Sequence, residues 1–331
     1  MGRTVTHASD AIKNAPPLAI WGAGPYRTRV TTETRRLLRS ARTSLPLALG
    51  LFLVGLVTIA ALSAPLVGPL FAPDPYAQVA PRDQTPPTPP DRDHPFGTDA
   101  MGRDLVSRVL FGARLSLVVA VGAQAIALAL GLAIGAAAGW KGGIVDALAM
   151  RGADVLLALP APLVALAVAA AVPEPESVPL LRALPIPAAG VVLLVLAGIG
   201  WAGIARLVRG EIRRLRAESY AGAARAAGAG PLRILGRHLL PNASGPILVT
   251  ATLGLGGNIL MEAWLSFLGV GARPPIPSWG TMIAESQMHF LQRPWAGLVP
   301  GIAILTAVLG FNLLGDALRD RLDPKLRSAP V

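Results

Sequence analysis

The sequence predicts an all-α, polytopic membrane protein with six transmembrane helices. Hydrophobic residues make up 53% of its 331 residues and charged residues only 15%, a balance typical of membrane proteins. Apolar stretches of about 20 residues, long enough to cross a bilayer, recur along the chain. Lipid offers the peptide backbone no hydrogen-bond partner, so each stretch is expected to be helical.

Six spans follow from these apolar stretches. They are Pro46–Val67, Ser116–Gly139, Val155–Val172, Pro187–Ile204, Ile247–Val270 and Ala296–Leu314. An alternative for the first stretch is a cleaved leader, because Ala61-Leu62-Ser63-Ala64 has the small residues of a cleavage site. We favour a span, since the stretch is long for a leader and follows a polar, basic segment.

The segments around the first span differ in character. Residues 1–44 are expected to form a partly flexible N-terminal extension, irregular up to Thr32. The proline-rich external segment Phe71–Pro95 predicts an ordered but irregular strap. Beyond it, Leu105, Val106, Val109 and Leu110 alternate at helical spacing with Arg103, Arg108 and Arg114, which predicts an amphipathic helix on the outer surface.

This pattern divides the chain into four regions. Residues 1–44 are the extension, and residues 45–115 hold the first span, the strap and the surface helix. Residues 116–317 form the core membrane domain with a loop at 206–242, and residues 318–331 form the C-terminal tail.

Positive charge is distributed unequally across the predicted spans. Of the 30 Lys and Arg residues, 22 lie on the side of both termini and of the 206–242 loop, and eight lie on the other. The positive-inside rule therefore places both termini and this loop in the cytoplasm. Topology explains the net charge of +11, and few aromatic residues accompany the basic ones, so no nucleic-acid partner is expected.

Small and polar residues mark particular faces of the spans. Gly131, Gly135 and Gly139 recur every fourth residue and predict a face buried against another helix. Glu262 lies within the fifth apolar stretch, with Asn258 and Ser266 nearby. A buried carboxylate is costly, so Glu262 either lines a water-filled translocation path or pairs with a neighbouring helix. Outside this stretch, Arg151 and Asp154 are expected to form a local surface pair.

Several kinds of chemistry are missing from the sequence. The chain contains no cysteine and no phosphate-binding loop of the type that powers ATP hydrolysis. Its histidines, His7, His94, His238 and His289, lack the spacing of metal ligands. We therefore expect no catalytic residues, metal site or cofactor in this chain.

The 206–242 loop has the pattern of a docking element. Five alanines between residues 221 and 227 favour a short helix from Ser219, and Gly228 suits a left-handed cap at its end. Pro231 is placed to open a second short helix that runs to Leu240 and ends at Pro241. Arg225, Arg233 and Arg237 are expected to project from the pair.

In this loop the sequence resembles the permease subunits of ABC importers. Their cytoplasmic signature is Glu-Ala-Ala, three residues, Gly, nine residues and Ile-x-Leu-Pro, and the chain supplies Ala223, Ala224, Gly228, Leu240 and Pro241 in register. His238, preceded by Arg237, takes the isoleucine position, a variant typical of the dipeptide, oligopeptide and nickel branch. Gly222 stands where the family usually has glutamate, which removes a carboxylate expected to help anchor the partner.

Three further stretches extend the likeness over most of residues 45–327. His94–Asp99 with Gly102–Asp104, Leu265–Gly269 with Pro277–Gly280, and Gly315-Asp316 with Asp323-Pro324 resemble the second permease of peptide importers. Residues 1–44 lie outside it.

The resemblance implies the transmembrane domain of a type I ABC importer in a bacterial cytoplasmic (inner) membrane. Its implied partners are a second homologous permease, two ABC ATPase subunits that bind ATP and Mg, an extracytoplasmic substrate-binding protein and the lipid bilayer. The implied substrates are di- or oligopeptides, with nickel or another small solute as the alternative. A secondary transporter is less favoured, since midplane ion ligands are not evident.

The same resemblance assigns roles to individual residues. The ATPase-coupling residues would be Tyr220, Gly222, Ala223, Ala224, Arg225, Gly228, Arg237, His238, Leu240 and Pro241. Asn258, Glu262 and Ser266 are the candidates for the translocation path.

Overall fold

The computed structural model describes residues 25–72, 74–80, 85–172, 187–272 and 276–322, with the backbone alone for residues 25–44 and 187. The first part of the N-terminal extension, residues 173–186 and the residues from 323 onward, with Asp323-Pro324, lie outside the described residues. The regular structure of the described ranges is helical, apart from isolated bridges that join Gln78 to Arg103 and Thr98 to Asp104.

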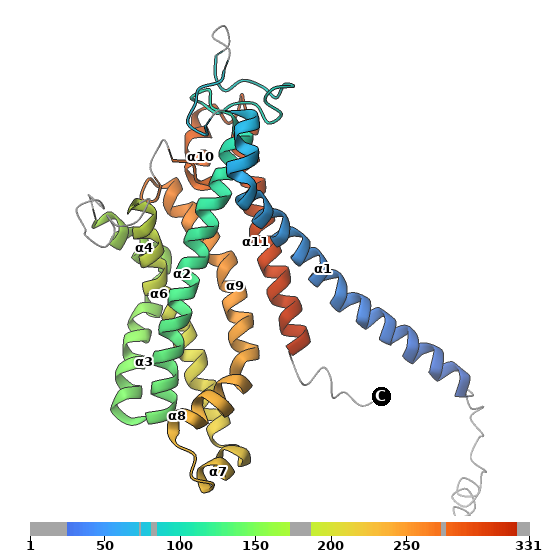
Figure 1. The fold of residues 1–331 in the computed structure, drawn as a ribbon, viewed down its shortest axis with the longest axis vertical. Helices are drawn as coiled ribbons and strands as arrows, with labels where there is room; N and C mark the ends of the chain where they lie inside the picture. The colour runs from blue at the N-terminus through green and yellow to red at the C-terminus, as the bar shows by residue number, and fades with distance from the viewer. Residues whose placement is uncertain (1–24, 73, 81–84, 173–186, 273–275, 323–331) are drawn as a thin grey trace, which may run out of the picture. The chain divides into compact units, whose positions relative to one another are not determined.

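Eight helices make up most of the described chain (Figure 1). They are α1 (Pro25–Phe71), α2 (Leu105–Lys141), α3 (Gly143–Ala158), α4 (Ala161–Ala170), α6 (Pro187–Arg216), α9 (Leu240–Phe267), α10 (Trp279–Ser286) and α11 (Trp295–Leu322). By length and composition five segments can each cross a membrane: Leu45–Phe71 of α1, α2, α6, the continuous helical segment Pro231–Phe267 that includes α9, and α11. Helices α3 and α4 make a sixth span if the bent pair counts as one. This arrangement agrees with the predicted all-α membrane fold.

The glycines of α2 lie directly against α6. A Cβ atom added at Gly135 would lie 2.5 Å from the backbone oxygen of Ala205 and 2.8 Å from Cβ of Val208. At Gly131 and Gly139 an added Cβ would meet Ile204 and Ile212 of the same helix. The missing side chains therefore allow the two backbones to approach closely, which strengthens van der Waals packing between helices in lipid.

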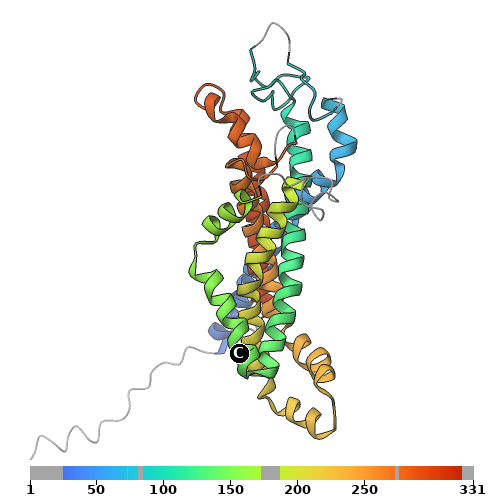
Figure 2. The ribbon, with the colours of Figure 1, turned by 90° about the vertical axis from the view of Figure 1, so that its left-hand side faces the viewer.

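Further helices pack around this pair. Helix α11 packs along α9, and α10 packs against both. The apolar part of α1 crosses α11 where Gly50 meets the backbone of Leu314 and Gly310 meets Leu53. Figures 1 and 2 both place the strap that precedes α2 at one end of these helices and the short helices between α6 and α9 at the opposite end.

The predicted surface helix before the second span is wrong. Residues 105–114 form the first turns of α2 and continue without a break into the span. Asp104 caps this helix, and its side chain accepts a hydrogen bond from the backbone of Ser107 at 2.7 Å. Arg103 and Arg108 do not face solvent as a surface helix requires, because buried carboxylates pair with both.

The predicted third span is also wrong as a continuous helix. Helices α3 and α4 meet at an angle of 91° around Leu159 and Pro160. Proline has no backbone N–H and disfavours helical geometry in the residue before it, and Leu159 is extended. Near this bend, Asp154 pairs with Arg206 of α6 rather than with Arg151, so the predicted local pair is not formed.

Three helix ends differ from the prediction. Helix α1 begins at Pro25 rather than after Thr32, because proline is tolerated in the first turn of a helix. Helix α6 continues to Arg216, so residues 206–216 of the predicted loop are helical. Pro241 does not end a helix but lies in the first turn of α9, and the helical backbone runs on from Pro231 through this turn to Phe267.

The contact between α2 and α6 yields a stability prediction. Gly135→Ala should lower the free energy of unfolding by about 1–3 kcal/mol, because the new Cβ overlaps the α6 backbone. Gly152→Ala is the matched control, since a Cβ there meets nothing within 4 Å. Thermal unfolding of the two purified variants in detergent measures the difference. Equal midpoints for both would show that the glycine face does not hold the helices together.

Candidate functional site

Two short helices connect α6 to α9. Helix α7 (Ser219–Ala226) is followed by Ala227 and then by Gly228, whose φ of 78° is left-handed. Two hydrogen bonds of 3.0 Å close the turn, from the N–H of Ala229 to the oxygen of Ala224 and from Gly228 to Arg225. This is a Schellman cap, in which a side chain at Gly228 would be strained. The chain then enters α8 (Pro231–Ile234) and a π-helical segment, η2 (Leu235–Leu239).

The helix pair is fixed to the end of the membrane helices. Ala221, Ile234 and Leu239 are fully buried in one apolar cluster with Ile212 and Leu215 of α6. The pair therefore moves with α6 and α9 as a packed unit. The π segment takes up half of the second helix that the sequence predicted, Pro231–Leu240, and such segments often occur at functional sites.

The outer surface of the pair consists mainly of small and basic residues. Ala223 and Ala226 are exposed on α7, together with Arg225. A surface of small side chains lets a partner approach the helix backbone. Leu232 is 85% exposed beside them, and sequence reasoning missed it. The sequence could have indicated Leu232, because it is an apolar residue directly after the proline that begins a helix expected to face water.

The predicted coupling residues come together on this element. Helix α7 carries Tyr220, Gly222, Ala223, Ala224 and Arg225; Gly228 caps it; η2 carries Arg237 and His238; and the first turn of α9 holds Leu240 and Pro241. A Cβ at Gly222 would meet nothing within 4 Å, so the position where the family usually has glutamate has room for a side chain.

Glu262 joins two helices inside the bundle. Its side chain accepts hydrogen bonds from Ser116 of α2 at 2.7 Å and from Ser266, one turn further along α9, at 2.8 Å. Glu262 and Ser266 are both only 2% exposed. This arrangement corresponds to the second of the two interpretations of Glu262, a structural partner for a neighbouring helix.

Asn258 lies in a different environment, on a cavity of about 320 Å³. Helices α2, α4, α6 and α9 form its walls. The Asn258 amide donates a hydrogen bond to Oε1 of Gln124 at 3.0 Å, and Thr250 adds a hydroxyl to the lining. Of the three predicted path residues, Asn258 is the one that lines this cavity. Sequence reasoning missed Gln124 and Thr250, although each is a polar residue within an apolar stretch.

A buried ionic cluster joins the short segment between the strap and α2, α2 itself, and α10 at the opposite end of the bundle. Arg103 contacts Asp99 at 2.6 Å and Glu285 of α10 at 2.5 Å. Arg108 contacts the same two carboxylates at 3.1 Å and 3.0 Å. The arginine side chains are 3% and 0% exposed, so two cations and two anions neutralise each other away from water. The spacing of Arg103 and Arg108 had predicted the solvent-facing side of a surface helix. No sequence pattern indicated that Glu285 would be their partner.

The comparison with known proteins covers these features. Residues 107–328 match the family described as "Binding-protein-dependent transport system inner membrane component". This chain belongs to that family. The match includes the glycines of α2, the short helices α7 and α8, and the residues that line the cavity. Because it belongs to this family and has several helices long enough to cross a bilayer, the chain is a multi-pass membrane protein.

Relatives of this inner membrane component extend over most of its length. The dipeptide transport system permease protein DppC of Alkalihalophilus pseudofirmus is 39% identical over 279 residues, 84% of this chain and 87% of the relative. The oligopeptide transport system permease protein OppC of Bacillus subtilis is 38% identical over 72% of this chain and 74% of the relative. The glutathione transport system permease protein GsiD of Pectobacterium atrosepticum is 39% identical over 72% and 75%.

The buried ionic cluster of this inner membrane component should contribute more to stability than an exposed ion pair does. Glu285→Ala should lower the free energy of unfolding by about 3–5 kcal/mol, because it leaves Arg103 and Arg108 with too little compensating charge in a buried site. Glu211→Ala is the control: it breaks a pair with the largely exposed Arg214 and should cost about 0–1 kcal/mol. Denaturant unfolding of both variants measures the two losses in free energy of unfolding. Losses of similar size would contradict the prediction.

Proposed function

We propose that this chain is the permease subunit of an ATP-driven importer of di- or oligopeptides. The observation that carries the proposal is the helix pair α7 and α8, packed onto α6 and α9 with an outer surface of small and basic residues. Relatives named as dipeptide, oligopeptide and glutathione permeases support a peptide as the substrate. Hydrolysis of ATP, with its Mg, belongs to partner subunits.

The distribution of charge supports an orientation for the helix pair. Arg225, Arg233 and Arg237 belong to the side of the membrane that carries 22 of the 30 basic residues. By the positive-inside rule, that side is the cytoplasm of a bacterial cell with this chain in its inner membrane. Two ABC ATPase subunits then have access to α7 and α8, and an extracytoplasmic binding protein delivers substrate at the strap end.

The cavity around Asn258 supports a shared path. Its walls come from four helices of a single chain, and a second homologous permease would enclose the remaining side of a path through the membrane. Gln124, Thr250 and Asn258 offer amide and hydroxyl groups, which suit the peptide bonds of a substrate better than a bare metal ion such as nickel.

Coupling requires that α7 and α8 contact the ATPase differently in its two states. A ligand that binds both conformations equally shifts no equilibrium. Because Ala221, Ile234 and Leu239 anchor the pair to the membrane helices, a displacement of the pair would pass to α6 and α9.

Copurification tests the assembly. A tagged chain expressed with its native neighbours should retain two soluble ATPase chains and a second multi-span permease. The reconstituted complex should take up labelled dipeptide only with ATP and the binding protein. Uptake by the purified chain alone would refute the proposal.

The cap of α7 gives a specific prediction. Gly228→Val should reduce peptide uptake and peptide-stimulated ATP hydrolysis by about tenfold or more, because a β-branched residue resists a φ of 78° and redirects α8. Gly230→Val is the matched control, since Gly230 has a φ of −70° and open space around its Cβ position. Both variants should insert into the membrane. Normal coupling in Gly228→Val would exclude the proposed role of the cap.

A substitution at Gly222 should strengthen the contact with the ATPase rather than weaken it. Gly222→Glu should strengthen retention of the ATPase during purification, because it restores the carboxylate typical of the family at a position with room for it. Gly222→Ala separates this effect from helix propensity, which alone is worth about 1 kcal/mol. ATPase dissociation from the immobilised complex is the measurement. Equal rates for Glu and Ala would show that the carboxylate adds nothing.

A further inference from the structure

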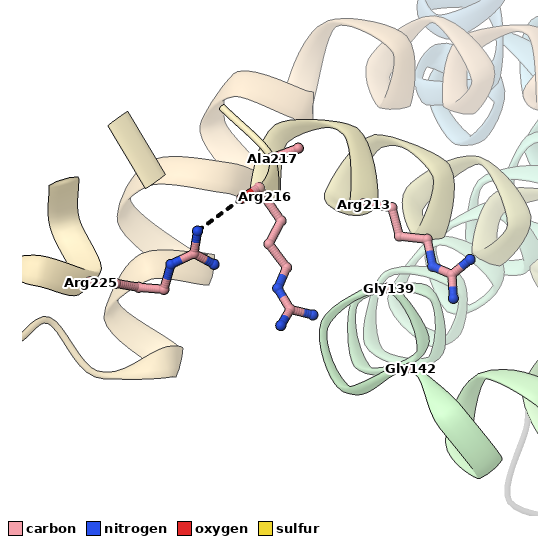
Figure 3. Close-up of a pocket in the computed structure, with 6 residues that line it drawn as sticks. All are labelled: Gly139, Gly142, Arg213, Arg216, Ala217 and Arg225. Atoms are coloured by element: carbon pink, nitrogen blue, oxygen red, sulfur yellow. Dashed lines mark hydrogen bonds between the residues drawn. The ribbon is translucent and has the colours of Figure 1, made fainter. Parts of the chain in front are cut away.

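A basic pocket lies where α2 and α6 end, next to α7 (Figure 3). Its volume is about 310 Å³, and it is lined by Gly139, Gly142, Arg213, Arg216, Ala217 and Arg225. The arginines come from the last turn of α6 and from α7, while the two glycines form the end of α2 and add no side chains to fill the space. All of the charged side chains in this lining are cations.

The positive charge of the pocket is only partly balanced by nearby carboxylates. Asp146 of α3 pairs with both Arg209 and Arg213, so one anion serves two cations. Arg216 and Arg225 form no ion pair with a carboxylate among the described residues. Their hydrogen bonds go to backbone oxygens, from Arg216 to Trp140 at 2.5 Å and from Arg225 to Arg216 at 3.3 Å. Such bonds orient the side chains without neutralising them.

Arg216 is also held in place by an aromatic ring. Its guanidinium carbon lies 5.1 Å from the centre of the Trp140 ring, within the range of a cation–π interaction. The contact and the hydrogen bond to the Trp140 carbonyl fix one cation at the end of α2. A planar guanidinium held in this way is suited to pair with two oxygens of a phosphate group.

The surroundings of the pocket favour lipid as the source of the phosphate. The pocket lies at the ends of two apolar helices, where the boundary between hydrocarbon and water is expected, and tryptophan is common at that boundary. Helix α3 begins next to Gly142, and its Ile144 and Leu148 are 78% and 64% exposed, which gives acyl chains an apolar surface. Basic pockets between membrane helices on the cytoplasmic side bind anionic headgroups.

We propose that the pocket of Arg213, Arg216 and Arg225 binds a phosphate group, and that in the membrane this group is the headgroup phosphate of an anionic lipid. The headgroup would bridge the end of α6 to α7, which the direct contact between Arg225 and Arg216 links only weakly. If α7 has the role proposed above, the lipid stiffens the element that receives motion from the ATPase. The binding itself does not depend on that role.

Native mass spectrometry of the full chain in detergent tests the binding. Phosphatidylglycerol should bind more tightly than phosphatidylcholine, whose choline cation opposes the arginines. The Arg216→Gln, Arg225→Gln double variant should weaken phosphatidylglycerol binding by about 30-fold. The Arg151→Gln, Arg233→Gln double variant removes two exposed arginines that lie outside the pocket lining and should bind like the unaltered chain.

The outcomes separate the proposal from its rivals. If both double variants lost the same affinity for phosphatidylglycerol, the loss would reflect net charge alone, and the proposed site would be overturned. Inorganic phosphate that displaces phosphatidylglycerol at equal concentration would overturn lipid as the source, whereas failure to displace it supports lipid. Arg225→Gln alone leaves the Trp140 contact intact, so a weaker affinity in this variant supports the site even if loss of Arg216 disturbs folding. Since only lipid and the purified chain are present, failure here leaves the transport proposal untouched.

Discussion

The close contact between α2 and α6 is the constraint on which the rest of the structure depends. In lipid, burial of apolar surface does not drive two helices together, because the lipid tails are equally apolar. Their packing therefore depends on close approach of the two backbones. Gly131, Gly135 and Gly139 provide that approach along much of α2. Because the end of α6 is fixed by this contact, the position of α7 and of the basic pocket beside it is fixed as well.

Several polar groups inside this bundle are matched by a partner from another element. Glu262 of α9 meets Ser116 of α2, and Asn258 meets Gln124. At the strap end, the pairing of Arg103 and Arg108 with Asp99 and Glu285 allows four charges to be buried. An isolated charge there would be costly, so these residues hold α10 against α2 and the segment that precedes it.

The opposite end of the bundle follows a different principle. Its arginines outnumber the carboxylates around them, and several keep their charge open to solvent. The buried cluster at the strap end is thus internally neutralised, whereas the α7 end offers unbalanced positive charge and small side chains to other molecules. This asymmetry fits an element that meets lipid headgroups and a separate protein on the same side of the membrane.

The sequence by itself determined the membrane class, the helical fold, the glycine face of α2 and the left-handed cap at Gly228. These features depend on local composition and spacing, which each segment carries within itself. The tertiary structure alone decided that Arg103 and Arg108 are buried, that Glu285 is their partner, and that Asp154 pairs with Arg206. Such pairings join residues far apart in sequence, and helical periodicity shows which face carries a charge but not what lies opposite. The break at Leu159 and Pro160 had a local signal in proline, yet the 91° angle depends on how α4 packs against α6.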